Sequence, residues 1–285
     1  MSLALAEAVA LGRGRLCAAG VETADLEARV LLERAAGLDR AALLSRGREP
    51  LDPAVAERYE RLLADRERRI PLSYLTGERE FWSLPLAVDA RVLVPRPETE
   101  TLVEAALERL GPSARVADVG TGSGAVAIAL ATERPGAAIW AVDRSGPALE
   151  VARANAAAHG VGERIVFLEG DLAAPLAQLE GTLDAVVSNP PYVPSAEIER
   201  LEPEVRDHEP RLALDGGEDG LAVIARLVAQ APWPLRPGGW LLLEVGAGQA
   251  GAVAALLRDA GAWDPAQTLR DLAGVERVVA ARRRG

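Results

Sequence analysis

The sequence predicts an α/β fold in which a mostly parallel β-sheet follows a small helical N-terminal region. After Arg115, short apolar runs alternate with helical stretches, which is typical of a parallel sheet with helices on both faces. Before about Leu75, apolar residues recur at helical spacing instead. The last apolar segments, residues 268–269 and 278–281, have no long helix between them, so we expect a terminal antiparallel strand.

Helix starts can be recognised in the N-terminal region. Thr23 and Asp39 are residue types that cap helices, and Asp52 followed by Pro53 is a strong start signal. We expect a helical bundle over residues 1–78.

The next segment changes its period. Apolar residues alternate over residues 81–94, which predicts a β-hairpin, and we take residues 79–95 as the linker between two domains. The run Pro95-Arg96-Pro97-Glu98-Thr99-Glu100 then suits a loop that enters a helix N-terminus. The second domain is expected over residues 96–285.

Strands and helices of the second domain follow from the alternation. The predicted strands are residues 116–119, 139–142, 165–168, 183–187 and 240–245, and the predicted helices are residues 124–132, 147–159, 220–231 and 249–260.

Composition limits the classes of function. The net charge is −10 and all cations are arginine, which argues against binding nucleic acid through the overall field. Cys17 is the only cysteine, so no internal disulfide is expected. Glu7 comes early and no basic region leads the chain, so a signal peptide is not expected. No apolar run reaches membrane-spanning length. We expect a cytoplasmic protein without a membrane partner; the sequence gives no oligomeric state, and a monomer is expected.

A glycine-rich loop stands where the first strand should turn into its helix. It contains Asp118, Gly120, Thr121, Gly122, Ser123 and Gly124. Glycine lets the backbone turn sharply and approach a ligand closely. Asp143 ends the second strand, and its separation from the glycine loop along the sequence is typical of an acid that binds ribose hydroxyls. These features fit an NAD enzyme as well as a methyltransferase.

Further polar residues end the following strands. Asp171 stands where an acid can accept a hydrogen bond from an adenine amino group, and Leu172 can pack on the ring. Asp118, Asp143, Asp171 and Asn189 thus end consecutive strands, and open sheets bind ligands along that edge.

The segment Ser188-Asn189-Pro190-Pro191-Tyr192 ends the fourth strand and favours nitrogen methylation. The two prolines stiffen the backbone, so the Asn189 side-chain oxygen and the Pro190 carbonyl are acceptors suited to an NH₂ group. Tyr192 offers a ring for a planar group. Holding the hydrogens of an amide localises its nitrogen lone pair and aims it at a methyl donor. No metal is required, and His159 and His208, the only histidines, lack ligand-spaced partners. We expect His159 at a helix end and His208 in a loop.

In these motifs the chain resembles the HemK/PrmC-type protein-(glutamine-N5) methyltransferases, which modify peptide chain release factors. The resemblance includes Pro71-Leu72-Ser73-Tyr74-Leu75-Thr76-Gly77, the run from Pro95 to Glu100, both motifs above, and Glu209-Pro210, Gly216-Gly217 and Asp219-Gly220-Leu221.

The resemblance implies a Rossmann-like seven-stranded methyltransferase sheet with a small N-terminal helical domain, joined by a β-hairpin and serving in substrate recognition. It implies S-adenosyl-L-methionine, with S-adenosyl-L-homocysteine as product. The implied cofactor residues are Asp118, Gly120, Thr121, Gly122, Ser123, Gly124, Asp143, Asp171, Leu172 and Asn189. The implied substrate is the glutamine of a Gly-Gly-Gln loop in release factors, bound by Asn189, Pro190, Pro191, Tyr192, Arg96 and Glu98, with catalysis by Asn189, Pro190 and Tyr192.

Other functions stay open at this stage. A glutamine on a ribosomal protein is a near alternative. An adenine-N6 or guanine-N2 nucleic-acid methyltransferase would use the same pocket on an extruded base, although Arg282-Arg283-Arg284 is the only dense basic run. A dehydrogenase and a non-catalytic scaffold fit the Asn189–Tyr192 motif poorly.

Overall fold

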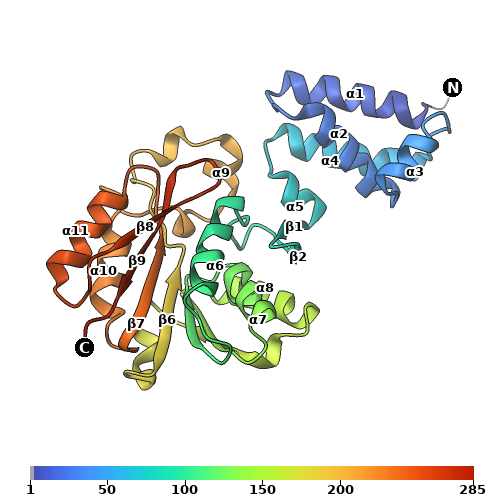
Figure 1. The fold of residues 1–285 in the computed structure, drawn as a ribbon. Coiled ribbons are helices and arrows are strands. Elements are labelled where there is room, and N and C mark those ends of the chain that lie inside the picture. Colours follow the sequence, from blue (N-terminus) through green and yellow to red (C-terminus); the bar gives the residue numbers. More distant parts are fainter. Residues whose placement is uncertain (1–2) are drawn as a thin grey trace. The chain divides into compact units, whose positions relative to one another are not determined.

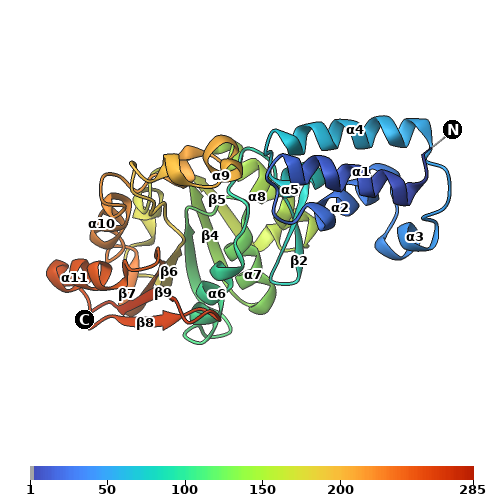
Figure 2. The same ribbon diagram turned by 90° about the horizontal axis from the view of Figure 1, so that it is seen from above.

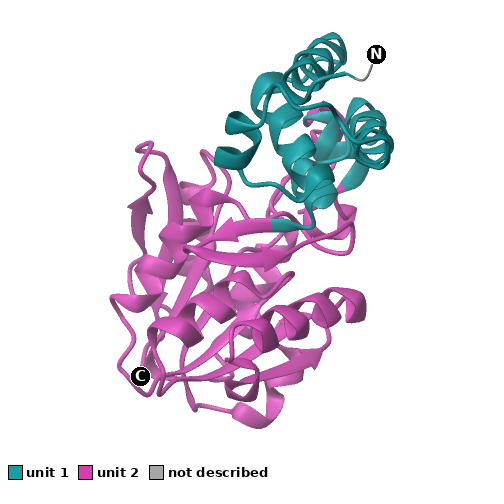
Figure 3. Cartoon of the chain, turned by 90° about the vertical axis from the view of Figure 1, so that its right-hand side faces the viewer, with its two compact units in different colours: residues 1–78, 202–208 teal, residues 79–201, 209–285 magenta. Residues whose placement is uncertain are grey.

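The computed structural model describes residues 3–285 and divides into two compact units. Unit 1 comprises Met1–Glu78 together with Glu202–His208, and unit 2 comprises Arg79–Leu201 and Glu209–Gly285 (Figure 3). A short segment from the second half of the chain therefore belongs to the N-terminal unit, which the sequence did not suggest.

Unit 1 is helical (Figure 1). Its helices are α1 (Leu5–Ala18), α2 (Ala24–Ala36), α3 (Arg40–Ser45), α4 (Pro53–Glu67), α5 (Leu72–Thr76) and α9 (Pro203–His208). The predicted caps at Asp39 and Asp52 are confirmed, because their carboxylates accept hydrogen bonds from the backbone N–H groups of Ala42 (2.7 Å) and Ala54 (2.8 Å).

Two sequence predictions in unit 1 were wrong in detail. Thr23 precedes α2, but its side chain accepts no backbone hydrogen bond and instead donates to Oε1 of Glu27 over 2.8 Å. His208 is the last residue of α9 rather than a loop residue, and its Nε2 lies 2.9 Å from the carbonyl oxygen of Arg68. Thr23 differs because its hydroxyl interacts with the Glu27 side chain instead of the backbone. His208 differs because its partner, Arg68, lies 140 positions away in the sequence.

A buried ion-pair network joins α9 to the other helices of unit 1. Arg66, with a side chain only 4% exposed, pairs with Glu27 and with Glu204, the latter at 2.6 Å. Arg69 donates to both carboxylate oxygens of Glu204 at 2.7 Å. A fork of this kind matches the geometry of a carboxylate, so Glu204 fixes its segment within unit 1.

The predicted β-hairpin exists but is shorter and earlier than residues 81–94. It consists of β1 (Glu78–Phe81) and β2 (Leu84–Ala87), joined by a turn in which Trp82 and Ser83 have φ of 54° and 57°. Such a turn matches the twist of paired strands. Asp89 ends the extended run, because its carboxylate accepts the backbone N–H of Arg91 (3.0 Å) and forms a local turn.

Unit 2 is built on a sheet of seven strands, as predicted. Its strands are β3 (Arg115–Val119), β4 (Ala138–Asp143), β5 (Ile165–Glu169), β6 (Leu183–Ser188), β7 (Leu235–Glu244), β8 (Gln267–Arg270) and β9 (Glu276–Arg282). Their order is β5-β4-β3-β6-β7-β9-β8. β9 runs antiparallel to β7 and β8, which confirms the expected terminal antiparallel strand. β7 begins before the predicted residue 240, in a stretch where Pro237 and two glycines suggest a turn.

Helices cover both faces of this sheet (Figures 1 and 2). They are α6 (Glu100–Leu107), α7 (Ala125–Glu133), α8 (Gly146–Ala158), α10 (Ala222–Gln230) and α11 (Ala250–Ala260), with short 3₁₀ turns at Pro97–Thr99, Gly162–Arg164, Ala174–Leu179, Ile198–Arg200 and Arg211–Ala213. α6, α7 and α8 share a core with Val116 and Ile139, whereas α10 and α11 pack with Ala117 and Leu241. Successive residues of β3 thus enter opposite cores, which explains its continuous apolar sequence.

The strand order creates a switch point beside β3. β4 and β5 extend the sheet on one side of β3, while β6 and β7 extend it on the other. Asp118 near the end of β3 pairs with Val187 near the end of β6. The loops that leave these two strands therefore start side by side, and open α/β sheets bind ligands at such a point. Within residues 3–285, no helix is both long and apolar enough to cross a membrane.

Candidate active site

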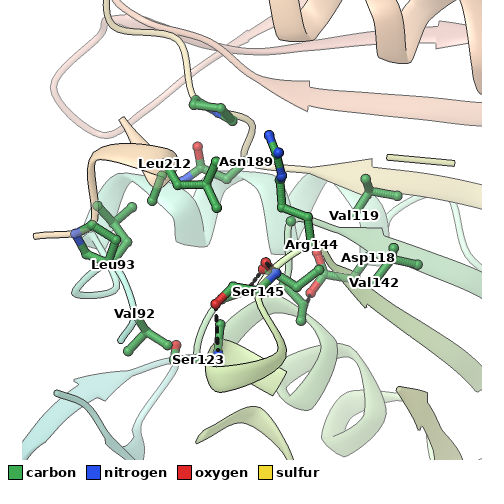
Figure 4. A pocket seen from close by; sticks show the side chains of 18 of the residues that line it. Val92, Leu93, Asp118, Val119, Ser123, Val142, Arg144, Ser145, Asn189 and Leu212 are labelled. Carbon is green, nitrogen blue, oxygen red and sulfur yellow. Dashed lines mark hydrogen bonds between the residues drawn. The ribbon is translucent and has the colours of Figure 1, made fainter. Parts of the chain in front are cut away.

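A pocket of about 1260 Å³, including its open mouth, lies at the carboxyl ends of β3, β4 and β6. The labelled side chains in Figure 4 come from these strand ends and from the segments around Leu93 and Leu212. The residues predicted from the sequence that line it are Asp118, Gly120, Thr121, Gly122, Ser123, Asp143, Asp171, Leu172, Asn189, Pro191 and Arg96. Gly124, Pro190, Tyr192 and Glu98 are not among the lining residues.

The glycine loop turns by left-handed backbone conformations. Gly120 and Gly122 have φ of 77° and 55°, and a Cβ on Gly122 would meet no atom within 4 Å. Its backbone is therefore open to the pocket. Gly124 has a different role, because a Cβ there would lie 3.0 Å from Ile128 and 3.2 Å from Ala152. It allows α7 to pack closely against α8.

Asp118 stabilises the glycine loop by hydrogen bonds to the loop and to the start of α7. Its Oδ2 accepts hydrogen bonds from the Thr121 hydroxyl (2.6 Å) and from the backbone N–H of Ala127 (3.1 Å). Burial raises the pKa of this carboxyl to about 7, although both hydrogen bonds act in the opposite direction.

Asp143, the last residue of β4, binds the backbone of two other residues that line the pocket. Its Oδ2 accepts the backbone N–H of Gly122 and its Oδ1 accepts the backbone N–H of Ser145, each over 2.9 Å. A carboxylate oxygen has two lone pairs, so each oxygen keeps one for a further donor.

Asp171 already has a protein partner. Its Oδ2 accepts a hydrogen bond from Arg226, and the two side chains are about half exposed. Leu172 adopts a left-handed conformation, with φ of 51°, which is uncommon for a residue with a branched side chain. Arg226 also lines the pocket, and no pattern in the sequence points to this residue.

Asn189 is fixed by a residue that sequence reasoning did not select. Its Nδ2 donates to the hydroxyl oxygen of Thr99 over 3.1 Å, which leaves Oδ1 as the free acceptor. Thr99 itself is 4% exposed. The preceding residue, Ser188, donates from its buried hydroxyl to the carbonyl oxygen of Val119 (2.6 Å), which ties the end of β6 to the glycine loop.

Tyr192 is partly buried against the core shared with α10 and α11. Its carbonyl oxygen accepts a hydrogen bond from the Gln249 side chain over 2.9 Å. Burial raises the pKa of its hydroxyl to about 12, so the phenol stays protonated.

Arg96 and Glu98 differ in their environments. Arg96 pairs at 2.6 Å with Oε1 of Glu209, whose side chain is 1% exposed, while Glu98 is exposed. Burial raises the pKa of Glu209, and the positive charge of Arg96 opposes this shift. The pair joins the segment before α6 to the segment that follows α9 in sequence, within unit 2.

Asn155 is a further residue that the sequence analysis missed. Its Oδ1 accepts the backbone N–H of Ala87 (2.8 Å), and its Nδ2 donates to the carbonyl oxygens of Ala87 (3.0 Å) and Ser123 (2.9 Å). It thus connects the end of the hairpin with the glycine loop. Only the fold brings these segments together, so no local pattern could have identified it.

Two family models match this chain. Residues 7–77 match the family model described as the PrmC N-terminal domain, and residues 97–202 match the methyltransferase small domain. A release factor glutamine methyltransferase from Moorella thermoacetica is 49% identical over 283 residues, covering 99% of this chain and 98% of that protein. The chain belongs to the release factor glutamine methyltransferase family.

Other members agree with this assignment. The protein of the same description from Deinococcus radiodurans is 48% identical and covers 95% of each chain. The one from Geobacter sulfurreducens is 44% identical, covering 95% of this chain and 93% of its own. Among solved structures, a ribosomal protein L11 methylase from Lactobacillus delbrueckii subsp. bulgaricus has a TM-score of 0.50 at 22% identity, over 70% of this chain and 84% of its own, which shows the shared fold.

The chain is therefore a methyltransferase that uses S-adenosylmethionine. The residues present fit this cofactor. The backbone at Gly122 is open to the pocket, and Asp143 keeps acceptor lone pairs beside it. Within residues 3–285, no group of three His, Cys, Asp or Glu side chains is arranged to hold a metal ion.

Proposed function

We propose that this protein methylates the side-chain amide nitrogen, N5, of the glutamine in the Gly-Gly-Gln loop of peptide chain release factors, and that it thereby modulates translation termination. The orientation of Asn189 is the observation that carries the proposal. Its NH₂ group is engaged by Thr99, so its Oδ1 remains as an acceptor next to the cofactor pocket. The names of the family members supply the substrate class.

We propose that the cofactor is held by the glycine loop, Asp143, Asp171, Leu172 and Asn189, with Asp118 supporting the loop. Asp143 accepts the ribose hydroxyls through its remaining lone pairs. Asp171 reaches the adenine amino group while it stays paired with Arg226, and Leu172 packs on the ring. When bound, the cofactor supplies an electrophilic methyl group on a sulfonium.

The protein's own contribution is to position and polarise the acceptor amide. An amide nitrogen is a poor nucleophile because its lone pair is delocalised into the carbonyl. Asn189 Oδ1 and the Pro190 carbonyl oxygen accept its two N–H hydrogens, which localises the lone pair and holds the nitrogen in line. Fixed acceptors also stabilise the positive charge that develops on that nitrogen.

The surrounding residues complete this binding site in our proposal. Pro191 and Tyr192 flank the planar amide, and the two consecutive prolines stiffen the loop that carries them. Arg96 and Glu98 contact the loop of the release factor. The methylated nitrogen is acidic and loses its proton readily, so no strong general base is needed.

We also propose a division of labour between segments of the chain. Residues 1–78 recognise the release factor, residues 79–95 link the two parts, and residues 96–285 bind the cofactor and carry out the transfer. The match of residues 7–77 to the PrmC N-terminal domain supports a recognition role for this part of the chain.

A nucleic-acid substrate has less support. In the basic run at the chain end, Arg282 donates to the carbonyl oxygen of Gly238 (2.9 Å) and Arg284 to that of Gly261 (3.1 Å). These guanidinium groups are engaged with the protein backbone, whereas phosphate binding relies on free cationic groups.

The proposal is tested by incubating the protein and S-adenosylmethionine with a release factor and locating any added methyl group by mass spectrometry. We expect a single methyl group on the Gly-Gly-Gln glutamine. Methylation of a ribosomal protein or of nucleic acid, with none on the release factor, would overturn the substrate assignment.

The role of Asn189 is tested by Asn189→Ala. We expect kcat to fall roughly 100-fold while S-adenosylhomocysteine binds within a few-fold of the wild-type affinity. Gln178→Ala removes an exposed amide elsewhere in unit 2 and serves as the control. A wild-type rate for Asn189→Ala would contradict the proposed mechanism.

A further inference from the structure

A carboxyl group that the proposed mechanism does not use is buried behind the Asn189–Tyr192 segment. Glu244 ends β7 and is 1% exposed. Its Oε2 has no hydrogen-bond partner among the described residues. An unsatisfied buried oxygen reduces stability, so a contribution to folding does not explain the presence of this carboxyl group.

The polar groups around Glu244 belong to the substrate site. The hydroxyls of Thr99 and Tyr192 lie near its carboxyl group, and each of them lowers the pKa of that group. Thr99 also accepts the hydrogen bond from Nδ2 of Asn189. Thr99 therefore stands between a buried carboxyl group and the side chain that we assign to the acceptor amide.

We propose that Thr99 and Glu244 are positioning residues that fix which end of the Asn189 amide faces the substrate, while Glu244 also holds the Tyr192 hydroxyl. This inference rests on the function proposed above. It assigns a role to the threonine of the Pro95–Glu100 run, which the motif alone left without one.

The direction of the hydrogen bonds explains the effect. A hydroxyl has a single hydrogen, and an ionised carboxylate can only accept. When Thr99 donates to the ionised Glu244, its oxygen is left as an acceptor and can bind only the NH₂ end of Asn189. The Oδ1 end is then turned toward the substrate. A neutral carboxyl or an amide at position 244 could donate instead, and the orientation of Asn189 would no longer be fixed.

The charge on Glu244 is sensitive to its surroundings. Burial raises its pKa to about 7, and the nearby Thr99 hydroxyl and the positive charge of Arg277 oppose this shift. Glu98 acts in the same direction as burial, and the Tyr192 hydroxyl acts against it. We therefore expect the orienting effect to weaken as the pH falls through about 7, when Glu244 takes up a proton.

Thr99→Val and Thr99→Ser form a matched pair for the test. Valine keeps the shape and removes the hydroxyl, whereas serine keeps the hydroxyl. We expect kcat for release-factor methylation to fall about tenfold in Thr99→Val, equivalent to about 1.4 kcal/mol, and to stay within about threefold of wild type in Thr99→Ser. S-adenosylhomocysteine affinity should change by less than about twofold in both. Thr132→Val makes the same chemical change at an exposed position of α7 and is the control.

Glu244→Gln tests the carboxyl group. We expect kcat to fall about tenfold and the melting temperature to stay equal or rise. The decline of kcat below about pH 7 that we expect for wild type should be absent from this variant. Parallel loss of stability and activity would assign Glu244 a structural role and overturn the inference.

Two further outcomes separate the hypotheses. A wild-type kcat in Thr99→Val, or equal losses in the valine and serine variants, would also overturn the positioning role. Absence of glutamine methylation by the wild-type protein would instead overturn the proposed function, so the two failures are distinguishable.

Discussion

Gly122 donates its backbone N–H to Oδ2 of Asp143 over 2.9 Å, so the residue that we propose for binding the cofactor ribose also shapes the loop beside it. Loss of this carboxylate removes two interactions at once, because Oδ1 holds the backbone N–H of Ser145 in the same way.

Asp143→Ala is therefore expected to weaken S-adenosylhomocysteine binding by roughly 10- to 100-fold, the range expected for lost hydrogen bonds to a charged group. Isothermal titration calorimetry measures this directly. Asp143→Asn keeps an acceptor oxygen without the charge, so its affinity should lie between those of wild type and Asp143→Ala. Asp259→Ala, on the surface, should bind S-adenosylhomocysteine like wild type. A change of less than about threefold in Asp143→Ala would show that this carboxylate does not hold the cofactor.

Asn155→Ala is expected to destabilise the protein by about 2–4 kcal/mol, because Ala87 and Ser123 would lose partners for buried or half-buried backbone groups. Urea denaturation at neutral pH measures the difference. Glu150 lies on α8, as Asn155 does, and forms an exposed ion pair with Arg91. Glu150→Ala removes this pair and should lower the free energy of unfolding by less than about 1 kcal/mol. Equal effects of the two substitutions would contradict the connecting role of Asn155.

Gly220→Ala is expected to disturb the Asn189–Tyr192 segment through a direct clash. A Cβ at this position would lie 2.3 Å from the carbonyl oxygen of Tyr192, and Gly220 has a φ of 76°. We expect reduced kcat together with a loss of stability, measured by methylation rate and urea denaturation.

Gly248→Ala is the matched control for this clash. Gly248 has a φ of 84°, but a Cβ there meets nothing within 4 Å. It should lose about 1 kcal/mol from backbone strain and keep wild-type kcat. If both variants behaved alike, contact with Tyr192 would not be the cause.

The pH dependence of stability should carry the signature of Glu244. Its pKa is raised to about 7 in the folded protein from an ordinary value of 4.5, so the folded state binds the proton more tightly than the unfolded state. The stabilisation linked to this proton is complete below the ordinary pKa and is lost as the pH rises through about 7. Asp118, whose pKa is also raised to about 7, acts in the same direction.

Glu244→Gln removes its share of this dependence. As the pH rises from 5 to 8, the free energy of unfolding of the variant should increase relative to that of wild type by an amount on the order of 3 kcal/mol. Urea denaturation across this range checks the difference, with Glu180→Gln as an exposed control. A difference between wild type and Glu244→Gln that does not vary with pH would contradict the raised pKa.

Much of unit 2 could be predicted because its signals are local. The glycine loop, the acids at the strand ends and the two prolines after Asn189 constrain the backbone where they stand, and the structure brings most of them to one pocket. The hairpin prediction was less accurate, because Val92 and Val94 are apolar for burial without being in a strand.

The sequence by itself determined the succession of strands and helices along the chain, the helical N-terminal unit and the choice of candidate site residues. Periodicity, caps and turn residues act over a few positions, so they can be recognised without the tertiary structure. Only the tertiary structure decided which partners orient those residues. Asn189 meets Thr99 across 90 positions and Asn155 meets Ala87 across 68. Such contacts follow from how strands are ordered in the sheet and how helices pack on it, and these long-range arrangements leave no pattern in neighbouring residues.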